Sequence, residues 1–456
     1  MTTGSARVVV VGGGIAGLAA AHALLTGASS GSHAVTVLEA QPRLGGKIRT
    51  TPFAGHAGVD EGADAFLARV PWATDLAHAV GLGERLVSPA TGSASVWWDG
   101  LQTIPSGLVL GLPTDIGRLA RSRLIGWGGK LRAATEVLRP KSDVEHDSVG
   151  AFVRERFGDQ VHERLVDPLV GSIYAADTDR FSLRAVPQLA QLAASSRSVL
   201  LAARHRPAPP AGPVFYAPAG GMADLVDHTA RAIVDLGGEI KLDAACQTIE
   251  RDGDAWRVDG QHADAIVLAC PAAQAARLLG RVSVVAEPMA RIEYADVVLI
   301  TIAIPRRDWP ERLHGSSGYL VPKPVQRLVT AVSFASQKWS HLDREDHVVL
   351  RISLGRDGLP VLHLSDEQLL DAALTEVGGH LGIDLQPQAV RQSTWQRAFP
   401  QYRPHHDRLV TEIESQLPPS MVVAGASYHG IGIPACIHSG QRAAELIGQR
   451  ARSALL

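Results

Sequence analysis

Apolar and polar positions near the N-terminus follow a pattern that predicts a βαβ unit. Residues 8–11 form a continuous β-branched run, which is typical of a strand buried on both faces of a parallel sheet. The glycine-rich stretch 12–17 comes next, and then an Ala/Leu-rich segment, 18–25, with high helix propensity. A second strand is predicted at 34–38, so strand, turn, helix and strand fit within about 30 residues.

The middle of the chain has a helical pattern, and the second half has a β-type pattern. Between Ser148 and Val170, apolar side chains recur at steps of three and four residues, which predicts an amphipathic helix. Residues 204–213 carry four prolines and no apolar periodicity, so we expect a linker or surface loop there. Short strands are predicted at 240–242, 256–258, 265–268, 297–304, 348–354 and 421–424, and a final helix at 440–448.

Length, charge and cysteine content limit the number of domains and the kinds of partner and site that we expect. The chain has 456 residues, too many for one ordinary core, and this predicts two or three domains. A formal net charge of −2 provides no field that attracts nucleic acid, so we expect no nucleic-acid partner. The 3 cysteines lie far apart and no CxxC or HExxH pattern occurs, so we expect neither a disulfide framework nor a metal site.

Apolar segments of the sequence predict no membrane span. The N-terminal apolar run lacks the basic region of a signal peptide. The longest apolar patch elsewhere, 104–112, is interrupted by Pro105 and Gly107 and falls short of the about 20 residues that a spanning helix needs. The segment 104–112 could contact a membrane surface, form a lid or pack against helices in the ordinary way. Ordinary packing is the favoured alternative.

The stretch 12–17 satisfies the G-x-G-x-x-G pattern of dinucleotide-binding proteins. Gly12 makes the tight turn out of the strand, Gly14 lets a pyrophosphate approach the backbone, and Gly17 lets the helix pack closely on the sheet. Glu39 closes the second strand about 20 residues further on, where a carboxylate accepts ribose hydroxyls and repels the 2′-phosphate of NADP. An accidental glycine-rich turn is the alternative to a nucleotide site.

The segment after Glu39 favours FAD over a nicotinamide cofactor. Gly45 and Gly46 are adjacent and are flanked by the cations Arg43 and Lys47. They provide a second stretch of backbone able to lie against phosphate or flavin, which simple nicotinamide domains rarely carry. A plain turn with solvated charges is the alternative.

Several long stretches resemble a known family. GGGIAGLAAA, VLEAQPRLGGKIRT and VDEGADAFLA resemble the N-terminal third of bacterial coproporphyrinogen III and protoporphyrinogen oxidases, which belong to the amine-oxidase-like FAD flavoproteins. DPLVGSIYAADTDRFSLRA is similar to the helical middle of this family, and VVAGASYHGIGIPACIHSGQRAAELI to its closing flavin segment. The resemblance therefore extends over nearly the whole chain.

The resemblance implies an α/β fold with a discontinuous Rossmann-type FAD-binding domain, a mixed-sheet substrate domain and an α-helical domain. We expect the FAD-binding domain at 1–85, 212–285 and 400–456. The helical domain is expected at 86–211 and the substrate-binding domain at 286–399, with boundaries defined only to within several residues.

The resemblance also implies a set of cofactor contacts. Lys47 matches the cation after the double glycine, and residues 61–64 match the loop whose backbone passes the flavin ring. Ala63 stands where the family usually has proline. Cys246 stands where the family has a valine whose backbone contacts adenine, so it is not expected to act as a nucleophile. The predicted cofactor-binding residues are Gly12, Gly13, Gly14, Ile15, Ala16, Gly17, Glu39, Ala40, Lys47, Glu61, Gly62, Ala63, Asp64, Cys246, Trp395, Ile431, Gly432 and Ile433.

Coproporphyrinogen III is the substrate that the resemblance favours, with protoporphyrinogen IX as the alternative. The family removes six hydrogens in three two-electron steps through flavin, and molecular oxygen is reduced to hydrogen peroxide. No catalytic side chain is expected, because the flavin carries the chemistry. His429, beside the closing segment, is more readily a hydrogen-bonding residue of its loop than a base.

Two residues are candidates for binding the substrate. Arg69 lies in the region of a propionate-binding cation, where a guanidinium group pairs well with a carboxylate. A solvated surface arginine is its alternative role. Tyr174 is a candidate for lining the face of the tetrapyrrole, and a buried structural tyrosine is the alternative that we favour there.

Two other function classes share this superfamily. Amine oxidases usually place an aromatic cage at the flavin face, where this chain has Gly432. GDP-dissociation inhibitors keep the fold as a binding scaffold without flavin, which the complete phosphate turn argues against. We expect a cytoplasmic enzyme with at most peripheral membrane contact, and a ferrochelatase is a candidate partner.

Overall fold

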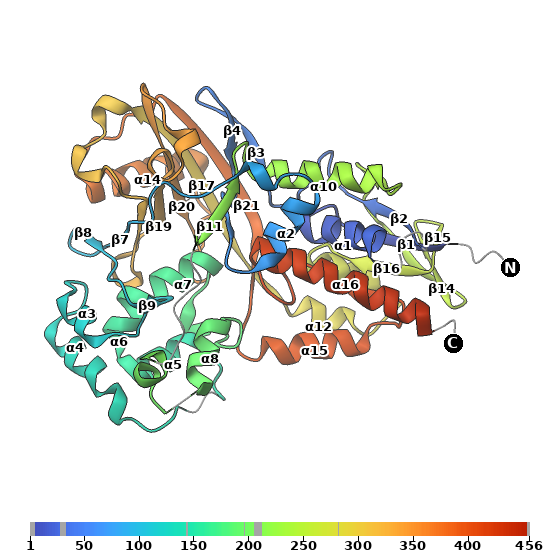
Figure 1. The fold of residues 1–456 in the computed structure, drawn as a ribbon, viewed down its shortest axis with the longest axis horizontal. Helices are drawn as coiled ribbons and strands as arrows, with labels where there is room; N and C mark the ends of the chain where they lie inside the picture. The colour runs from blue at the N-terminus through green and yellow to red at the C-terminus, as the bar shows by residue number, and fades with distance from the viewer. Residues whose placement is uncertain are drawn as a thin grey trace.

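The chain forms a parallel sheet, a mixed sheet and a group of helices (Figure 1). This arrangement confirms the predicted α/β fold class, in which a Rossmann-type sheet is combined with a mixed sheet and a helical region. The domain boundaries stay a prediction. The computed structural model describes residues 5–27, 33–142, 145–195, 197–204, 212–280 and 282–453.

The parallel sheet is covered on both faces. Val8 and Val10 of its central strand pack on the side of the first helix, whereas Val9 and Val11 pack on the opposite side, because successive side chains of a strand alternate. Burial on both faces explains the continuous apolar runs in the sequence. In spatial order the strands are β12 (Glu239–Lys241), β2 (His33–Leu38), β1 (Ala6–Val11), β16 (Ala265–Leu268) and β22 (Met421–Val423).

The first and last helices of the chain lie side by side against this sheet (Figure 1). They approach so closely that a Cβ added to Gly440 would lie 2.2 Å from the carbonyl oxygen of Ala16. The N-terminal and C-terminal parts therefore form one unit. Helix α16 begins at Ile433 and is longer than the predicted helix 440–448. The helices of this face are α1 (Ile15–Thr26), α2 (Pro71–Ala79), α10 (Ala223–Asp235) and α16 (Ile433–Ser453).

The opposite face of the sheet carries a small antiparallel sheet and three helices. Trp256 is 1% exposed in the core between them. The elements are β13 (Ile249–Asp252), β14 (Ala255–Val258), β15 (Gln261–Ala263), α11 (Ala272–Leu279), α12 (Ala286–Ala290) and α15 (His406–Gln416). Short strands pack in the core on the α1 side of the sheet: β3 (Thr50–Phe53) pairs with β4 (His56–Asp60), and β11 (Phe215–Pro218) pairs with β5 (Phe66–Leu67) and β6 (Leu86–Val87).

The mixed sheet has seven strands and is antiparallel except where β18 meets β7. One face packs against α14 (Asp366–Leu381), which begins with a capping box formed by Ser365 and Gln368. Every strand that the sequence predicts is present in one of the sheets. In spatial order the strands are β21 (Ala389–Gln401), β17 (Glu293–Pro305), β20 (His347–Leu354), β19 (Val329–Phe334), β18 (Gly318–Leu320), β7 (Ala94–Trp97) and β8 (Leu101–Thr103).

The helical region corrects one prediction. The single helix expected between Ser148 and Val170 is interrupted, because Gly158 has φ +87° and His162–Val166 form a π-helical turn. The predicted apolar stripe is nevertheless buried. Most of the linker predicted at 204–213 lies outside the described residues. The helices are α3 (Ile116–Arg121), α4 (Trp127–Ala134), α5 (Val149–Phe157), α6 (Asp159–Val161), α7 (Asp167–Tyr174), α8 (Pro187–Ser195) and α9 (Val199–Arg204).

The apolar segment 104–112 packs against the helical core, as the favoured alternative predicts. Ile104, Leu108 and Val109 are partly buried on this core, and Leu112 is fully buried within it. Among the described residues, no helix has the length and apolar character needed to cross a membrane.

Candidate functional site

The glycine-rich turn between β1 and α1 is shaped by close backbone contacts. Gly12 has φ +115°, and a Cβ added to Gly17 would lie 2.0 Å from the Gly12 carbonyl oxygen, so both positions require glycine. A Cβ added to Gly14 would meet nothing within 4 Å. Gly14 caps α1 without a side-chain hydrogen bond, so the N–H groups of the first turn can receive an anion.

Glu39 at the end of β2 is tied to this turn. Its carboxylate is 7% exposed, and it accepts hydrogen bonds from the backbone N–H of Gly13 and of Gln41, each at 2.8 Å. One bond to each oxygen leaves further acceptor capacity, which two ribose hydroxyls would use. Ala40 follows on the exposed side. Cys246 is buried nearby in the core, and burial raises the pKa of its thiol to about 12, so it is not a nucleophile.

The double glycine lies directly against the phosphate turn. Gly45 donates to the Gly13 carbonyl oxygen at 2.9 Å, and a Cβ added to Gly46 would lie 3.4 Å from the Gly14 Cα. Arg43 donates to three carbonyl groups of its own loop, so its role is to shape this turn. The predicted cations flanking the double glycine therefore have different functions.

Unlike Arg43, Lys47 makes no hydrogen bond to the described residues of its own loop, so its cation is available to a ligand. Its Nζ donates to the Ala398 carbonyl oxygen and lies 5.9 Å from the centre of the Tyr294 ring. Part of its surface is open to solvent while protein surrounds the rest, and this burial lowers the pKa of Lys47 to about 8. Its charge is therefore responsive to pH.

Hydrogen bonds from residues of the seven-stranded sheet hold the loop 61–64 in place. Glu61 accepts hydrogen bonds from Thr51 at 2.7 Å and Ser393 at 2.9 Å, and Trp395 Nε1 donates to the Glu61 carbonyl oxygen at 2.8 Å. Burial alone would raise the pKa of Glu61, but these hydroxyl groups and the charge of Arg49 hold it below its usual value. Ala63 is exposed at the tip of the loop.

Arg351 and Lys338 anchor the end of this loop, and the sequence did not predict either. Arg351 Nη1 lies 2.9 Å from the Asp64 carboxylate and its Nη2 donates to the Gly62 carbonyl oxygen. Lys338 Nζ and Trp339 Nε1 lie 3.1 Å and 3.2 Å from the same carboxylate. The charges of Lys338 and Arg351 and the hydrogen bond from Trp339 lower the pKa of Asp64 despite its burial. A lone arginine inside the apolar strand VVLRISL was the available signal.

The closing segment reaches the phosphate turn from the other end of the chain. A Cβ added to Gly425 would lie 3.7 Å from the Cβ of Ala16. Further along, Ile431 packs on the helical core and Ile433 packs in the core beneath α1. Gly432 between them is exposed. The two glycine-rich ends of the sequence are thus brought together, as the sequence suggested.

The candidate substrate residues differ in burial. Arg69 is exposed and makes no ion pair with any described residue. Tyr174 packs on Phe181 with 4.8 Å between ring centroids, and burial raises its pKa to about 12. His429 lies 2.7 Å from the Glu414 carboxylate, which favours the hydrogen-bonding role over that of a base.

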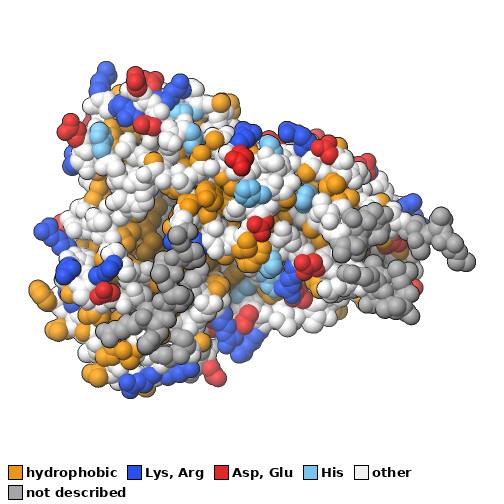
Figure 2. All heavy atoms as spheres, in the orientation of Figure 1, with side chains coloured by type: hydrophobic (Ala, Val, Ile, Leu, Met, Phe, Trp, Pro, Cys, Tyr) orange, Lys and Arg blue, Asp and Glu red, His pale blue; other side chains and the backbone are white. Residues whose placement is uncertain are grey.

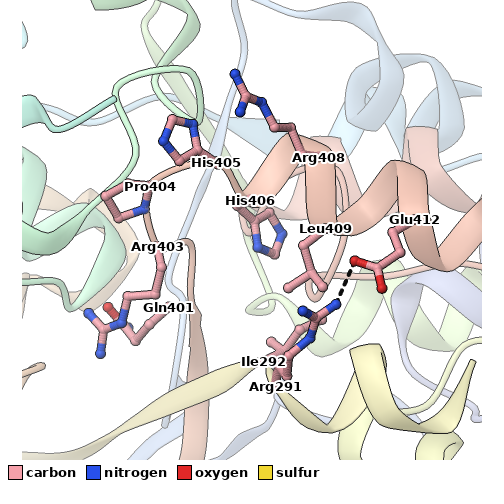
Figure 3. A pocket seen from close by; sticks show the side chains of 10 residues that line it. All are labelled: Arg291, Ile292, Gln401, Arg403, Pro404, His405, His406, Arg408, Leu409 and Glu412. Carbon is pink, nitrogen blue, oxygen red and sulfur yellow. Dashed lines mark hydrogen bonds and ion pairs between the residues drawn. The ribbon is translucent and has the colours of Figure 1, made fainter. Parts of the chain in front are cut away.

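A pocket of about 370 Å³ opens beside the start of α15 (Figure 3). It contains none of the predicted site residues, and two of its three arginines, Arg291 and Arg403, are paired with carboxylates. Within the described part of the chain, no cluster of three or more histidine, cysteine or acidic residues could hold a metal ion.

The arrangement matches that of a protein family. Residues 15–448 match the model of flavin containing amine oxidoreductases. The chain belongs to this family. Its cofactor is FAD, and the open face of Gly14, the uncapped start of α1 and the buried Glu39 carboxylate fit the phosphates and ribose of that cofactor. The protein is an oxidoreductase rather than a flavin-free scaffold.

Similar proteins extend over the whole chain. Coproporphyrinogen III oxidase of Mycobacterium tuberculosis is 34% identical, covering 95% of each chain. The Bacillus subtilis enzyme of that name is 29% identical and covers 97% of this chain and 98% of its own. A solved structure from Exiguobacterium sp. 255-15, assigned as a protoporphyrinogen oxidase, has a TM-score of 0.85 at 29% identity over 98% of this chain and 99% of that chain. Cyclohexylamine oxidase of Brevibacterium oxydans IH-35A, at 18% identity and a TM-score of 0.69 over 98% of this chain and 100% of that chain, shares the fold.

Proposed function

We propose that this chain oxidises coproporphyrinogen III to coproporphyrin III in haem biosynthesis. The observation that carries the proposal is the open space beside Gly432, where a Cβ would meet only the Cδ of Pro434, at 3.8 Å. Glycine at this exposed position leaves room for a broad flat ring, whereas an aromatic cage would narrow the space to that of a small amine. The relatives named as coproporphyrinogen III oxidases support the same substrate.

The side chains of the site bind and orient, and the cofactor supplies the electron chemistry. When bound, FAD supplies a two-electron oxidation that no side chain provides. Three such oxidations remove six hydrogens from the porphyrinogen. The terminal acceptor in this proposal is molecular oxygen, which is reduced to hydrogen peroxide.

Each predicted contact has a role in holding FAD. The turn 12–17 and the start of α1 would bind the pyrophosphate, and Glu39 with Ala40 would bind the adenosine ribose. The backbone at Cys246 would contact adenine. Residues 61–64, with Lys47 and Trp395, would border the flavin ring, and residues 431–433 would border its pyrimidine end.

Arg69 and Tyr174 are the proposed substrate contacts. The exposed guanidinium of Arg69, free of any ion pair among the described residues, is available to a propionate carboxylate. Tyr174, partly buried beside Phe181, lines the face of the tetrapyrrole in this proposal. In Arg69→Met we expect KM to rise about tenfold with little change in kcat, and in Arg307→Met, where a surface arginine 84% exposed is removed, we expect no change.

Anaerobic mixing with coproporphyrinogen III tests the function. We expect the flavin absorbance to bleach while porphyrin fluorescence appears, and hydrogen peroxide to form after oxygen is admitted. Flavin that stays oxidised with coproporphyrinogen III contradicts the proposal. A higher kcat/KM for protoporphyrinogen IX would instead assign the alternative substrate.

Peripheral membrane contact through α4 is a further part of the proposal. Trp127, Leu131 and Leu138 are 78%, 68% and 77% exposed, which is unusual for large apolar side chains. Residues 116–135 contain five cations and no acid, so this surface suits anionic lipid. In Figure 2 apolar and cationic side chains gather on the corner of the molecule where Figure 1 shows α3 and α4.

Vesicle sedimentation tests this contact. We expect binding to phosphatidylglycerol vesicles but not to phosphatidylcholine vesicles, and loss of binding in Trp127→Ser. Val284→Ser is a matched control, because Val284 is also 78% exposed but lies on another surface. Equal binding by the two variants would contradict the lipid contact.

A ferrochelatase is the proposed protein partner. The product is a free porphyrin, and the class of enzyme that must consume it inserts a metal ion. Analytical ultracentrifugation of the two purified enzymes, with and without porphyrin, tests the association. A mixture that sediments as two independent species would contradict it.

A further inference from the structure

The closing loop between β22 and α16 is held by one buried hydroxyl group. Tyr402, at the end of β21, donates to the Ala426 carbonyl oxygen at 2.6 Å and accepts from the Gly430 N–H at 2.8 Å. The Tyr402 side chain is 3% exposed. A single side chain from another element therefore bridges both ends of the turn 426–430.

His406, at the start of α15, supports the same turn. Its Nε2 lies 3.1 Å from the Ser427 carbonyl oxygen, and its ring stacks on Tyr402 with 3.9 Å between centroids and an interplanar angle of 10°. Figure 3 shows His406 beside His405 at this end of the helix. Burial lowers the pKa of His406 to about 4, so the ring is neutral near pH 7 and Nε2–H remains a donor.

The conformation of the turn depends on these contacts. Gly430 has φ +133°, which side-chain-bearing residues avoid, and a Cβ there would lie 2.6 Å from the Cβ of Ala435. Its N–H has Tyr402 as acceptor, so the hydroxyl fixes the orientation of the peptide group between His429 and Gly430, one peptide before the group that leads into Ile431. Phe181 of the helical region lies parallel to Tyr402 at 6.0 Å, which fixes the ring itself.

We propose that Tyr402, supported by His406, is a positioning residue for the flavin. The pair fixes the turn 426–430 so that Ile431 and Gly432 are presented to the cofactor. The inference rests on the proposed function in one respect, the placement of 431–433 at the pyrimidine end of the flavin. It does not depend on which porphyrinogen is oxidised.

Tyr402→Phe tests this role. The variant keeps the stacked ring but leaves the Gly430 N–H and the Ala426 carbonyl group without their partner, so the segment that follows loses its fixed orientation. We expect the Kd for FAD, measured by fluorescence titration of the deflavinated full-length protein, to rise about tenfold. We also expect a shift of the visible absorption bands of bound flavin, which a loss of stability alone would not cause.

Two tyrosines provide matched controls. Tyr428 is 2% exposed in the same loop, and its hydroxyl has no hydrogen-bond partner among the described residues. Tyr319 is also 2% exposed, but its hydroxyl bonds to His380 Nδ1 at 3.1 Å in the seven-stranded sheet. Phenylalanine at either position should leave the Kd and the flavin spectrum unchanged, even where Tyr319→Phe lowers stability.

A wild-type Kd and spectrum in Tyr402→Phe would overturn the inference. If that variant does not fold, His406→Phe takes its place, because it keeps the stack and loses the hydrogen bonds of the ring to the backbone of Ser427 and Tyr428. Its Kd should rise about threefold, and an unchanged Kd would overturn the inference equally. The FAD titration contains no porphyrinogen, so its outcome is independent of the proposed substrate. If the proposed function fails and the inference holds, Tyr402→Phe alters FAD binding although the wild-type protein does not oxidise coproporphyrinogen III.

Discussion

Thr50 donates its hydroxyl to the carboxyl group of Asp60, with 2.5 Å between Oγ1 and Oδ1, next to the loop that carries Glu61 and Asp64. The backbone N–H of Met222 donates to the same oxygen at 2.9 Å. Burial nevertheless dominates and raises the pKa of Asp60 from 3.8 to about 6. A carboxyl group beside the proposed flavin loop is therefore partly protonated near pH 6.

Asp60→Asn should change the pH dependence of stability. Because the folded pKa lies above the unfolded pKa, the folded state binds more protons between about pH 4 and 6, and the free energy of unfolding falls as pH rises through that window. Asparagine keeps the acceptor oxygen for Thr50 and has no charge to bury. We compare the free energy of unfolding of the variant minus that of wild type at two pH values. We expect this difference to be about 2 kcal/mol larger at pH 7.5 than at pH 4.

Urea unfolding at several pH values measures this effect. Asp371→Asn, on the exposed side of α14, is the control and should leave the pH profile as in wild type. If Asp60→Asn and wild type have parallel profiles between pH 4 and 7.5, the carboxyl group does not titrate as described.

Arg351→Met should destabilise the protein strongly. Arg351 is 5% exposed and holds both the Asp64 carboxylate and the Gly62 carbonyl group, so its loss leaves a buried charge with fewer partners. We expect the free energy of unfolding to fall by about 3 kcal/mol. Lys338→Met should cost less, because the Lys338 side chain is 21% exposed and Asp64 keeps Arg351. Equal losses in urea unfolding would contradict this ranking.

The sequence predicted elements whose determinants are local. The βαβ unit followed from β-branched runs and glycines within 40 residues, and it is present as β1, α1 and β2. Strand β21 was not predicted as such, because AVRQSTWQRAFPQ is polar at most positions and forms the edge of its sheet. The break in the helix expected between Ser148 and Val170 depends on Gly158, a residue tolerated within many helical patterns.

Site residues were predictable where a motif contains them and not where tertiary pairing supplies them. The turn 12–17 and Glu39 belong to one motif, and their contacts were expected. Arg351 and Tyr402 reach the site from strands more than 280 residues away from the N-terminal motif, so no local spacing indicates them. Strand β20 brings Arg351 beside the loop 61–64, and the end of β21 brings Tyr402 beside the closing loop, so tertiary pairing alone places both residues there.

Lys47 should make FAD binding depend on pH. Burial lowers its pKa to about 8, so its ammonium charge is present below pH 8 and is lost as pH rises above it. An anionic cofactor binds the charged form better, so we expect the Kd for FAD to rise by up to about tenfold between pH 7 and 9. Lys47→Met should bind FAD more weakly than wild type at pH 7, and its Kd should not rise with pH. FAD titrations at pH 7, 8 and 9 measure this dependence. A Kd that rises with pH in the variant as it does in wild type would contradict the role of Lys47.

Gly14→Ala and Gly17→Ala should separate cofactor binding from folding. A Cβ at Gly14 meets no protein atom within 4 Å, and its φ of −72° is acceptable to alanine, so the fold and the thermal stability without cofactor should be unchanged. The same methyl group occupies the space assigned to pyrophosphate, so we expect FAD affinity to fall at least a hundredfold. A Cβ at Gly17 would lie 2.0 Å from the Gly12 carbonyl oxygen, and Gly17→Ala should therefore lower the melting temperature even in the absence of FAD. Calorimetry of the deflavinated proteins together with FAD titration measures both quantities, and wild-type FAD affinity in Gly14→Ala would place the pyrophosphate elsewhere.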